Sequence, residues 1–174
     1  MISFMLLAGP RSGTTWAANL LNTDTTQCIH DPLLEYKLAH LDNIFVPNKR
    51  VGISCTSMLI YPEWVARHPA KKVILYREPD EINASLKQLG LPLIDPVRYQ
   101  RRIDALPQVP VRSWKHMFTS GGAAEICDML GVPFDSWRFH ELAKMRIQPE
   151  FVSLPVDPEA VKALVKRVTE ANAA

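Results

Sequence analysis

Residues 2–16 read Ile-Ser-Phe-Met-Leu-Leu-Ala-Gly-Pro-Arg-Ser-Gly-Thr-Thr-Trp, and this stretch decides the fold. Residues 2–8 form a short continuous apolar run, which is typical of a strand buried on both faces of a parallel sheet. Residues 14–21 predict a helix packed on that sheet, because their apolar side chains recur at helical spacing at Trp16, Ala17, Leu20 and Leu21. The stretch therefore predicts a strand, a loop and a helix in immediate succession.

The loop of residues 9–15 is suited to hold a phosphate. Backbone N–H groups at a helix start are unpaired and lie at the positive end of the helix dipole, so they attract an anion. Gly13 lets the backbone approach that anion closely, and Arg11 adds a bidentate positive charge. Three hydroxyls can donate further hydrogen bonds, those of Ser12, Thr14 and Thr15. The alternative is a well-capped helix start that binds no ligand.

The same loop departs from the ATP-binding pattern G-x-x-x-x-G-K-[ST]. Ala8 replaces the first Gly, and Thr14 stands where that pattern has its Lys. In ATP-dependent enzymes this Lys reaches the β- and γ-phosphates. The sequence therefore disfavours an ordinary enzyme that uses ATP and Mg²⁺.

Strand and helix signals alternate along the rest of the chain. Strands are predicted at 27–30, 51–55 and 73–76, with a further candidate at 109–114, and helices at 33–41, 79–89, 121–130 and from Asp157 onward. Residues 90–110 are irregular apart from a basic helical piece at 98–102. The alternation predicts an α/β fold with a three-layer parallel sheet, and residues 1–174 as a single P-loop domain.

Ligands of such sheets bind at the carboxyl ends of the strands. Three polar groups fall at predicted strand ends, namely residues 9–15, the pair His30-Asp31, and Arg77. We therefore expect these residues to share one site.

Composition excludes several other classes of protein. The chain has 174 residues, 47% of them hydrophobic, and a net charge of +2 with scattered basic residues, so neither disorder nor a nucleic-acid partner is expected. The 3 cysteines form no CxxC pair, which predicts buried free thiols, no metal site and a reducing cytoplasmic compartment. No apolar stretch approaches the roughly 20 residues that span a membrane, and residues 2–8 lack the basic flank of a signal peptide. A homo-oligomer is left open.

Residues 10–16, Pro-Arg-Ser-Gly-Thr-Thr-Trp, resemble the P-[KR]-S-G-T-T-W loop of sulfotransferases that use 3′-phosphoadenosine 5′-phosphosulfate (PAPS). The resemblance implies that this loop holds the 5′-phosphosulfate of PAPS. It also implies that Arg11 contacts the bridging and sulfuryl oxygens and that Trp16 packs beside the adenine. A metal is not expected.

A second motif resembles the 3′-phosphate site of the same family. There an Arg at a strand end is followed by a Pro and, eight residues after the Arg, by a Ser on the next helix. This sequence has Arg77-Glu78-Pro79 and then Ser85. The structural alternative is an Arg77 that pairs with Glu78 or Asp80, with Ser85 facing solvent.

Towards the carboxyl terminus the resemblance is incomplete. Residues 131–135 resemble the L-G-[VL]-P-[FW]-D phrase of many bacterial members. The family's basic Arg-Lys-Gly loop, which closes over the 3′-phosphate, is missing. Lys144 and Arg146 form the nearest basic cluster, and a solvated helix face is the better interpretation of that pair.

Sulfuryl transfer also needs a general base within hydrogen-bond reach of the acceptor. The resemblance points to the residues after the second strand, with Asp31 favoured, His30 second and Glu35 in reserve. Asp31 before Pro32 is also an ordinary turn initiator, and His30 could be a satisfied core histidine. Arg11 is the expected stabiliser of the charge that spreads over the transferred group.

The leading hypothesis is thus a PAPS-dependent sulfotransferase that acts on a hydroxyl or amine. The alternatives are a P-loop nucleotide or nucleoside kinase and a non-catalytic nucleotide-binding protein of the same fold. The acceptor is not readable from the residues. Basic residues at 98, 101 and 102 fit either an anionic acceptor or a solvated helix. Because sulfotransferase domains generally run longer, an open site or one completed by a partner is expected.

Overall fold

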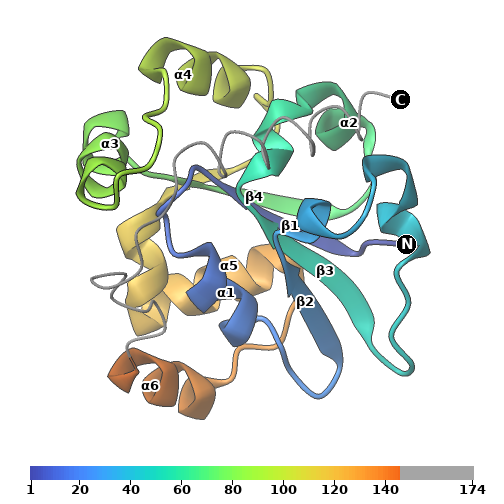
Figure 1. The fold of residues 1–174 in the computed structure, drawn as a ribbon. Coiled ribbons are helices and arrows are strands. Elements are labelled where there is room, and N and C mark those ends of the chain that lie inside the picture. Colours follow the sequence, from blue (N-terminus) through green and yellow to red (C-terminus); the bar gives the residue numbers. More distant parts are fainter. Residues whose placement is uncertain (146–174) are drawn as a thin grey trace.

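The computed structural model describes residues 1–145, and all structural statements below refer to them. Five parallel strands form one sheet in the order β2-β3-β1-β4-β5 (Figure 1). The strands are β1 (Phe4–Ala8), β2 (Thr26–His30), β3 (Arg50–Cys55), β4 (Lys71–Tyr76) and β5 (Val111–Ser113). The helices are α1 (Thr14–Leu20), α2 (Pro62–Arg67), α3 (Pro79–Gln88), α4 (Pro96–Asp104), α5 (Ser120–Leu130) and α6 (Ser136–Lys144).

The strand β1 is central because every one of its side chains is apolar and fully buried. It pairs in parallel with β3 on one side and β4 on the other, so that Leu6 lies between Ser54 and Val73. Such a strand suits a sheet covered on both faces. The predicted α/β fold with a three-layer parallel sheet is confirmed.

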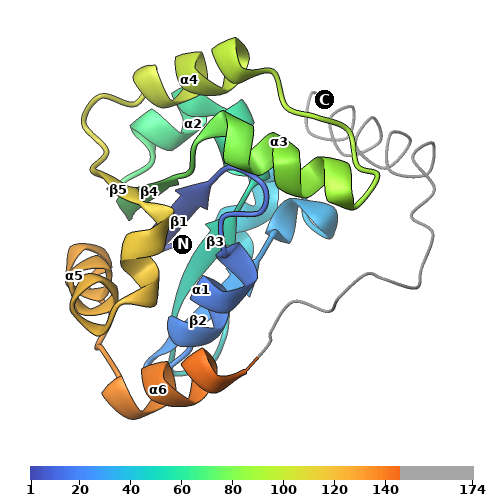
Figure 2. The ribbon, with the colours of Figure 1, turned by 90° about the vertical axis from the view of Figure 1, so that its left-hand side faces the viewer.

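Two hydrophobic cores lie on opposite faces of this sheet. Successive strand residues point to opposite faces, so Phe4 and Leu6 join one core and Met5 and Leu7 the other. Helices α1, α5 and α6 pack on the first face, and α2, α3 and α4 on the second (Figure 2). The arrangement places the loop between β1 and α1 at the carboxyl edge of the sheet.

The helix predicted at 33–41 is wrong. The structure instead has two 3₁₀ helices, Pro32–Leu34 and Leu38–Asn43, separated by an extended residue, Lys37, with φ −71° and ψ 148°. Most side chains between the buried Leu33 and Leu41 are exposed. An α-helix here would have no continuous apolar face to bury, so packing does not stabilise one.

Other elements are found close to where they were predicted. The basic piece at 98–102 belongs to α4, which begins at Pro96 and is capped by the Asp95 carboxylate. The candidate strand at 109–114 is the short β5. The sequence signals did not predict α2, which has only 6 residues. The helix predicted from Asp157 onward lies outside the described residues.

The helices and the cysteines can be compared with the predictions made from composition. No helix within the described part of the chain combines the length and apolar character needed to cross a membrane. All three cysteines are buried free thiols: Cys28, Cys55 and Cys127.

Candidate functional site

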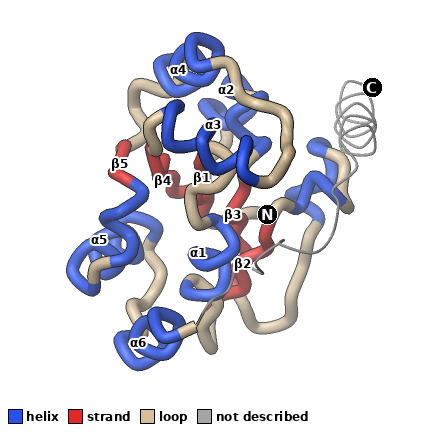
Figure 3. The backbone as a smooth tube through the Cα atoms, turned by 60° about the vertical axis from the view of Figure 1, so that its left-hand side comes forward, coloured by secondary structure: helices blue, strands red, loops and turns tan. Residues whose placement is uncertain are grey.

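The three predicted groups of polar residues meet at the carboxyl edge of the sheet. Residues 9–15 follow β1, His30 and Asp31 close β2, and Arg77 follows β4. The loop that joins β1 to α1 passes beside α3, which brings segments far apart in the sequence together (Figure 3). The structure therefore brings the three groups together at one edge of the sheet, and their role as one functional site stays a prediction.

The loop has the backbone conformation of an anion cradle. Arg11 has φ 63° and Gly13 has φ 80°, so both occupy the left-handed region. Left-handed positions of this kind occur in backbone nests that bind anions. Ser12 is fully buried under the loop, and its hydroxyl lies 3.5 Å from the carbonyl oxygen of Pro10.

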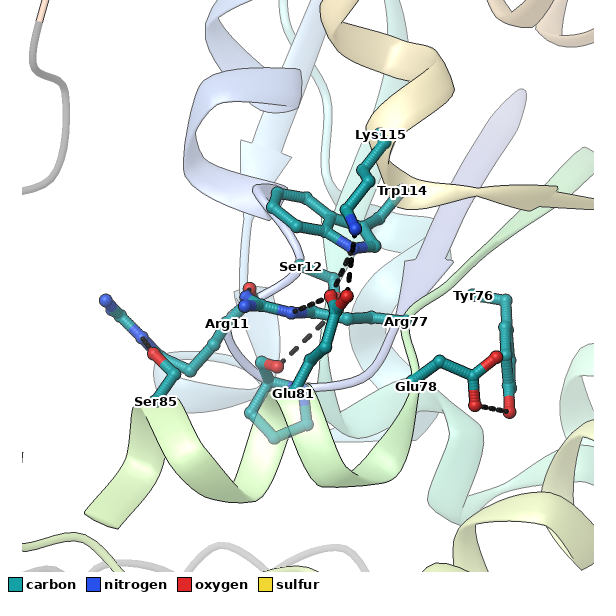
Figure 4. A network of polar contacts seen from close by, with 10 residues as sticks. Arg11, Ser12, Tyr76, Arg77, Glu78, Glu81, Ser85, Trp114 and Lys115 are labelled. Atoms are coloured by element: carbon teal, nitrogen blue, oxygen red, sulfur yellow. Dashed lines mark hydrogen bonds and ion pairs between the residues drawn. The ribbon is translucent and has the colours of Figure 1, made fainter. Parts of the chain in front are cut away.

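Arg11 and Ser85 are 74 residues apart in sequence but lie in contact. The Nε of Arg11 donates a hydrogen bond of 3.2 Å to the hydroxyl oxygen of Ser85 on α3 (Figure 4). Burial, and then the positive charge of Arg77, lowers the pKa of Arg11. The two motifs recognised separately in the sequence therefore belong to one cluster.

Arg77 is held firmly beside them. One guanidinium nitrogen donates to the carbonyl oxygen of Arg11, and Nε lies 3.3 Å from a carboxylate oxygen of Glu81. The guanidinium carbon also lies 4.2 Å from the ring centre of Trp114, in cation–π contact. This is not the pairing with Glu78 or Asp80 considered above, because Glu78 instead accepts from the hydroxyl of Tyr76.

Glu81 is the acidic centre of this cluster. It accepts hydrogen bonds from the indole N–H of Trp114 at 3.1 Å and from Lys115 at 2.9 Å (Figure 4). The bond from Lys115, and then the one from Trp114, lowers the pKa of Glu81. Sequence reasoning missed these residues, although Arg77 and Glu81 have the four-residue spacing of a helical ion pair. No local sequence pattern indicated that Trp114 and Lys115 would contact Glu81, because more than 30 residues separate them in the chain.

His30 and Asp31 lie against the same loop. The Nε2 atom of His30 is 3.1 Å from the hydroxyl of Thr14, 3.2 Å from that of Thr15 and 3.3 Å from the Asp31 carboxylate. The other carboxylate oxygen of Asp31 accepts from the backbone N–H of Thr56 at 2.7 Å and from its hydroxyl at 3.1 Å. Both candidate bases are thus fixed next to the candidate phosphate loop, and Thr56 is a further residue that the sequence did not reveal.

Trp16 is placed differently from the other loop residues. Its side chain is 6% exposed, its ring centre lies 5.0 Å from that of Phe118 and 5.7 Å from that of Phe139, and its indole N–H donates to the carbonyl of Leu142. These contacts join α1 to α6 in the core. Packing beside an adenine stays a prediction.

The reserve base Glu35 and the basic residue Lys144 are both exposed. Glu35 is exposed after the first 3₁₀ helix. Lys144 is exposed and pairs with Glu141 on α6 at 2.6 Å, as expected of a solvated helix face, and Arg146 lies outside the described residues. Within residues 1–145, no group of three or more His, Cys, Asp or Glu side chains is placed to hold a metal ion.

The comparisons with known proteins define the class of fold. No protein-family model matches the chain, and no curated protein matches it in sequence. Several solved structures resemble it in fold, among them two sulfotransferases. One is the sulfotransferase domain of the Synechococcus PCC 7002 olefin synthase, with a TM-score of 0.57 and 14% identity over 100% of this chain and 95% of that one.

The other is mouse sulfotransferase SULT7A1, solved in complex with PAP. Its TM-score is 0.50 at 14% identity, over 82% of this chain and 63% of the mouse chain. The molecule therefore has the P-loop fold of the sulfotransferases.

Proposed function

We propose that this protein is a sulfotransferase that moves a sulfuryl group from PAPS to a hydroxyl or amine acceptor and releases 3′,5′-diphosphoadenosine (PAP). The observation that carries the proposal is the convergence of Arg11 on the loop with Arg77 and Ser85 of the segment that joins β4 to α3. Two phosphate groups at opposite ends of one nucleotide need such a paired cationic site. The likeness to a sulfotransferase complexed with PAP supports the same ligand class.

The residues divide between two ends of the donor. In the proposal, the backbone of Gly13 and the hydroxyls of Thr14 and Thr15 hold the 5′-phosphosulfate, while Arg77 and Ser85 hold the 3′-phosphate. Ser12, which is fully buried, supports the loop from within. Arg11 lies between them, and its fixed charge stabilises the oxygens over which negative charge spreads during transfer.

The transfer step uses a base at the end of β2. The acceptor oxygen or nitrogen attacks sulfur in line and forms a new bond to it. The bond from sulfur to the bridging phosphate oxygen breaks, and the electron pair leaves with PAP. The acceptor proton passes to Asp31 or to His30, which lie 3.3 Å apart beside the loop.

Donor recognition is tested by a thermal-shift panel of PAPS, PAP, ATP and ADP. A ligand at about 100 times its Kd stabilises the folded state by about 2.7 kcal/mol, which is several degrees of Tm for a chain of this size. We expect PAPS and PAP to give this shift and ADP to give much less. Arg77→Ala should remove most of the advantage of PAP over ADP. Equal shifts with PAP and ADP in the parent protein would refute donor recognition through the 3′-phosphate.

The matched control for Arg77→Ala is Arg112→Ala. Arg112 lies on β5 and pairs with Glu125 at 2.7 Å, so it is also an ion-paired Arg. Within residues 1–145 its side-chain hydrogen bonds go to Glu125 and Val111 and not to the loop. Arg112→Ala should leave the increase in Tm caused by PAP unchanged. Turnover of ATP with Mg²⁺ in place of PAPS would establish the kinase alternative instead.

The base is tested with labelled PAPS and a panel of hydroxyl and amine acceptors. Asp31→Asn and His30→Ala should each retain the PAP-induced Tm shift, and we expect a fall in kcat of about 100-fold or more for the variant that removes the base. Unchanged kcat in both variants would place the base elsewhere.

A further inference from the structure

A cavity of about 260 Å³ lies beside the candidate phosphate loop. Pro10 of the loop and Thr56 at the end of β3 line one part of it, and the α4 residues Arg98, Tyr99 and Arg102 line another. None of the residue roles proposed above uses the α4 side of this cavity.

The cavity lies next to both the candidate phosphate loop and a residue that contacts the candidate base Asp31. Pro10 directly precedes Arg11, and Thr56 donates two hydrogen bonds to Asp31, at 2.7 and 3.1 Å. A molecule that fills the cavity therefore lies next to the loop and next to a residue that contacts a candidate base. An acceptor bound in this cavity would lie beside the loop and close to a candidate base.

The α4 wall of the cavity carries two arginine side chains. Arg98 and Arg102 are four residues apart and so lie on the same face of the helix. Among residues 1–145, neither guanidinium has an acidic partner. Asp95 also lines the cavity, but one of its carboxylate oxygens already accepts from two N–H groups at the start of α4. Burial, and then the charge of Arg98, lowers the pKa of Arg102, and an anion placed between the two guanidinium groups would act in the opposite direction.

The same wall includes Tyr99, which is 4% exposed. Burial raises the pKa of Tyr99 to about 12, and hydrogen bonds from the backbone of Arg77 and Gly9 act in the opposite direction. The Tyr99 hydroxyl is therefore held against the loop and the end of β4. The segment before α4 is also held in place, because the side chain of Asn83 bonds both the N–H and the carbonyl of Ile94, at 2.8 and 3.1 Å.

We infer that this cavity is the acceptor subsite and that it selects an acceptor whose anionic group, a carboxylate or a phosphate, pairs with Arg98 and Arg102. The inference rests on the proposed sulfotransferase function. It assigns a substrate class, a hydroxyl or amine compound that also carries an anionic group.

The test is direct binding of three matched phenols in the presence of saturating PAP, measured by calorimetry. The probes are 4-hydroxyphenylacetate, 4-hydroxybenzylphosphonate and the neutral 4-hydroxyphenylacetamide. We expect at least one anionic probe to bind about tenfold more tightly than the amide, and the ratio between the two anions separates a carboxylate acceptor from a phosphate-bearing one. In R98Q/R102Q the preference should fall to within about twofold.

The control is Arg101→Gln, on the same helix but exposed and outside the cavity lining, which should keep the preference. PAP affinity, measured first, reports whether each variant is folded, and the single variant R102Q replaces the double one if that fails. Equal binding of anion and amide, no binding of either anion, or a preference that survives in R98Q/R102Q would overturn the inference. Failure of the donor proposal is seen separately, as a loss of the preference for PAP over ADP in the parent protein.

Discussion

Gly13 shows how one residue fixes the geometry of the loop. Its φ of 80° lies in the left-handed region, where side chains other than hydrogen are strained. A Cβ at this position would also lie 2.8 Å from the ring of Phe118. Backbone conformation and close packing therefore both require glycine at the entrance of α1.

Replacing Gly13 by Ala should cost more stability than the same change at Gly90 or Gly121, where a Cβ has open space. We expect Gly13→Ala to lower the free energy of unfolding by about 2 kcal/mol or more, since strain and overpacking add. Gly90→Ala has a similar φ of 66° but open space, so it should cost only about 1 kcal/mol. Gly121→Ala has open space and no left-handed φ and should be close to neutral. Urea denaturation gives the free energy of unfolding of each of the three variants. A Gly13→Ala protein as stable as Gly121→Ala would contradict the expected ranking.

At this scale the sequence predicted the residues whose signal is local. Arg11, Arg77 and Ser85 were found because each belongs to a motif with fixed spacing next to a strand or helix end. Thr56 and Trp114 were not found, because their roles depend on contacts between segments that are far apart in the chain.

The packing of helix α1 against α6 depends on Trp16. Its indole N–H donates to the carbonyl of Leu142 at 3.2 Å, and its ring is packed in the core. Trp16→Phe should therefore lower the free energy of unfolding by about 1–3 kcal/mol, because the carbonyl loses its donor and the smaller ring leaves a gap. Chemical denaturation gives this value, and calorimetry with PAP gives the affinity.

Measuring both the stability and the PAP affinity of Trp16→Phe shows whether Trp16 packs in the core or contacts the nucleotide. Trp16→Phe should change the Kd for PAP by less than about threefold, because the buried ring offers little surface to a base. A tenfold weaker Kd at unchanged stability would show instead that Trp16 packs on the nucleotide, as the sequence resemblance implies.

The start of β1 is tied to two other elements by Asp42. A carboxylate oxygen of Asp42 accepts from the N–H of Ile2 at 2.9 Å and from His68, which follows α2, at 3.0 Å. Burial alone would raise the pKa of Asp42, but the N–H of Ile2 and then His68 outweigh it, so the pKa lies below its usual value.

Because the pKa of Asp42 is lowered in the folded protein, its contribution to the free energy of unfolding depends on pH in a known direction. The stabilisation by Asp42 is present above the unfolded pKa of about 3.9 and is lost as the pH falls through the lower folded value. Asp42→Asn should therefore cost about 1 kcal/mol at neutral pH and progressively less below about pH 4. Urea titrations over that range measure the difference. Asp24→Asn, at an exposed acid, is the control and should show no such trend.

Elements with strong periodicity and end signals were predictable, and those formed by tertiary packing were not. The helix α3 begins at Pro79 and is followed by Gly90 in a left-handed conformation, as the sequence indicated. The short α2 and the 3₁₀ helices Pro32–Leu34 and Leu38–Asn43 have too few residues for a periodic pattern. Their conformations depend on which side chains the rest of the fold buries.

The three thiols report on opening of the whole molecule. Burial raises the pKa of Cys55 and of Cys127 to about 12 and raises that of Cys28 as well. At about pH 8 the native protein should therefore react with a disulfide reagent at only a small fraction of the rate of a free thiol, whereas denatured protein releases three equivalents. PAP should slow the native reaction further, because exposure then requires release of the ligand. Fast reaction of one thiol in the native state would reveal local opening at its strand or helix.

The central place of β1 has a consequence for how the chain folds as it is made. Phe4 pairs with Gly52 on one side and with Lys71 on the other, and Ala8 pairs with Leu75. Of the five strands, the first to be made is therefore the most apolar one, and it gains its second neighbour only when β4 has been made. Until about residue 75 has emerged, β1 has an unpaired edge that chaperones or other nascent chains can bind. Translation speed over this interval should influence the yield of folded protein.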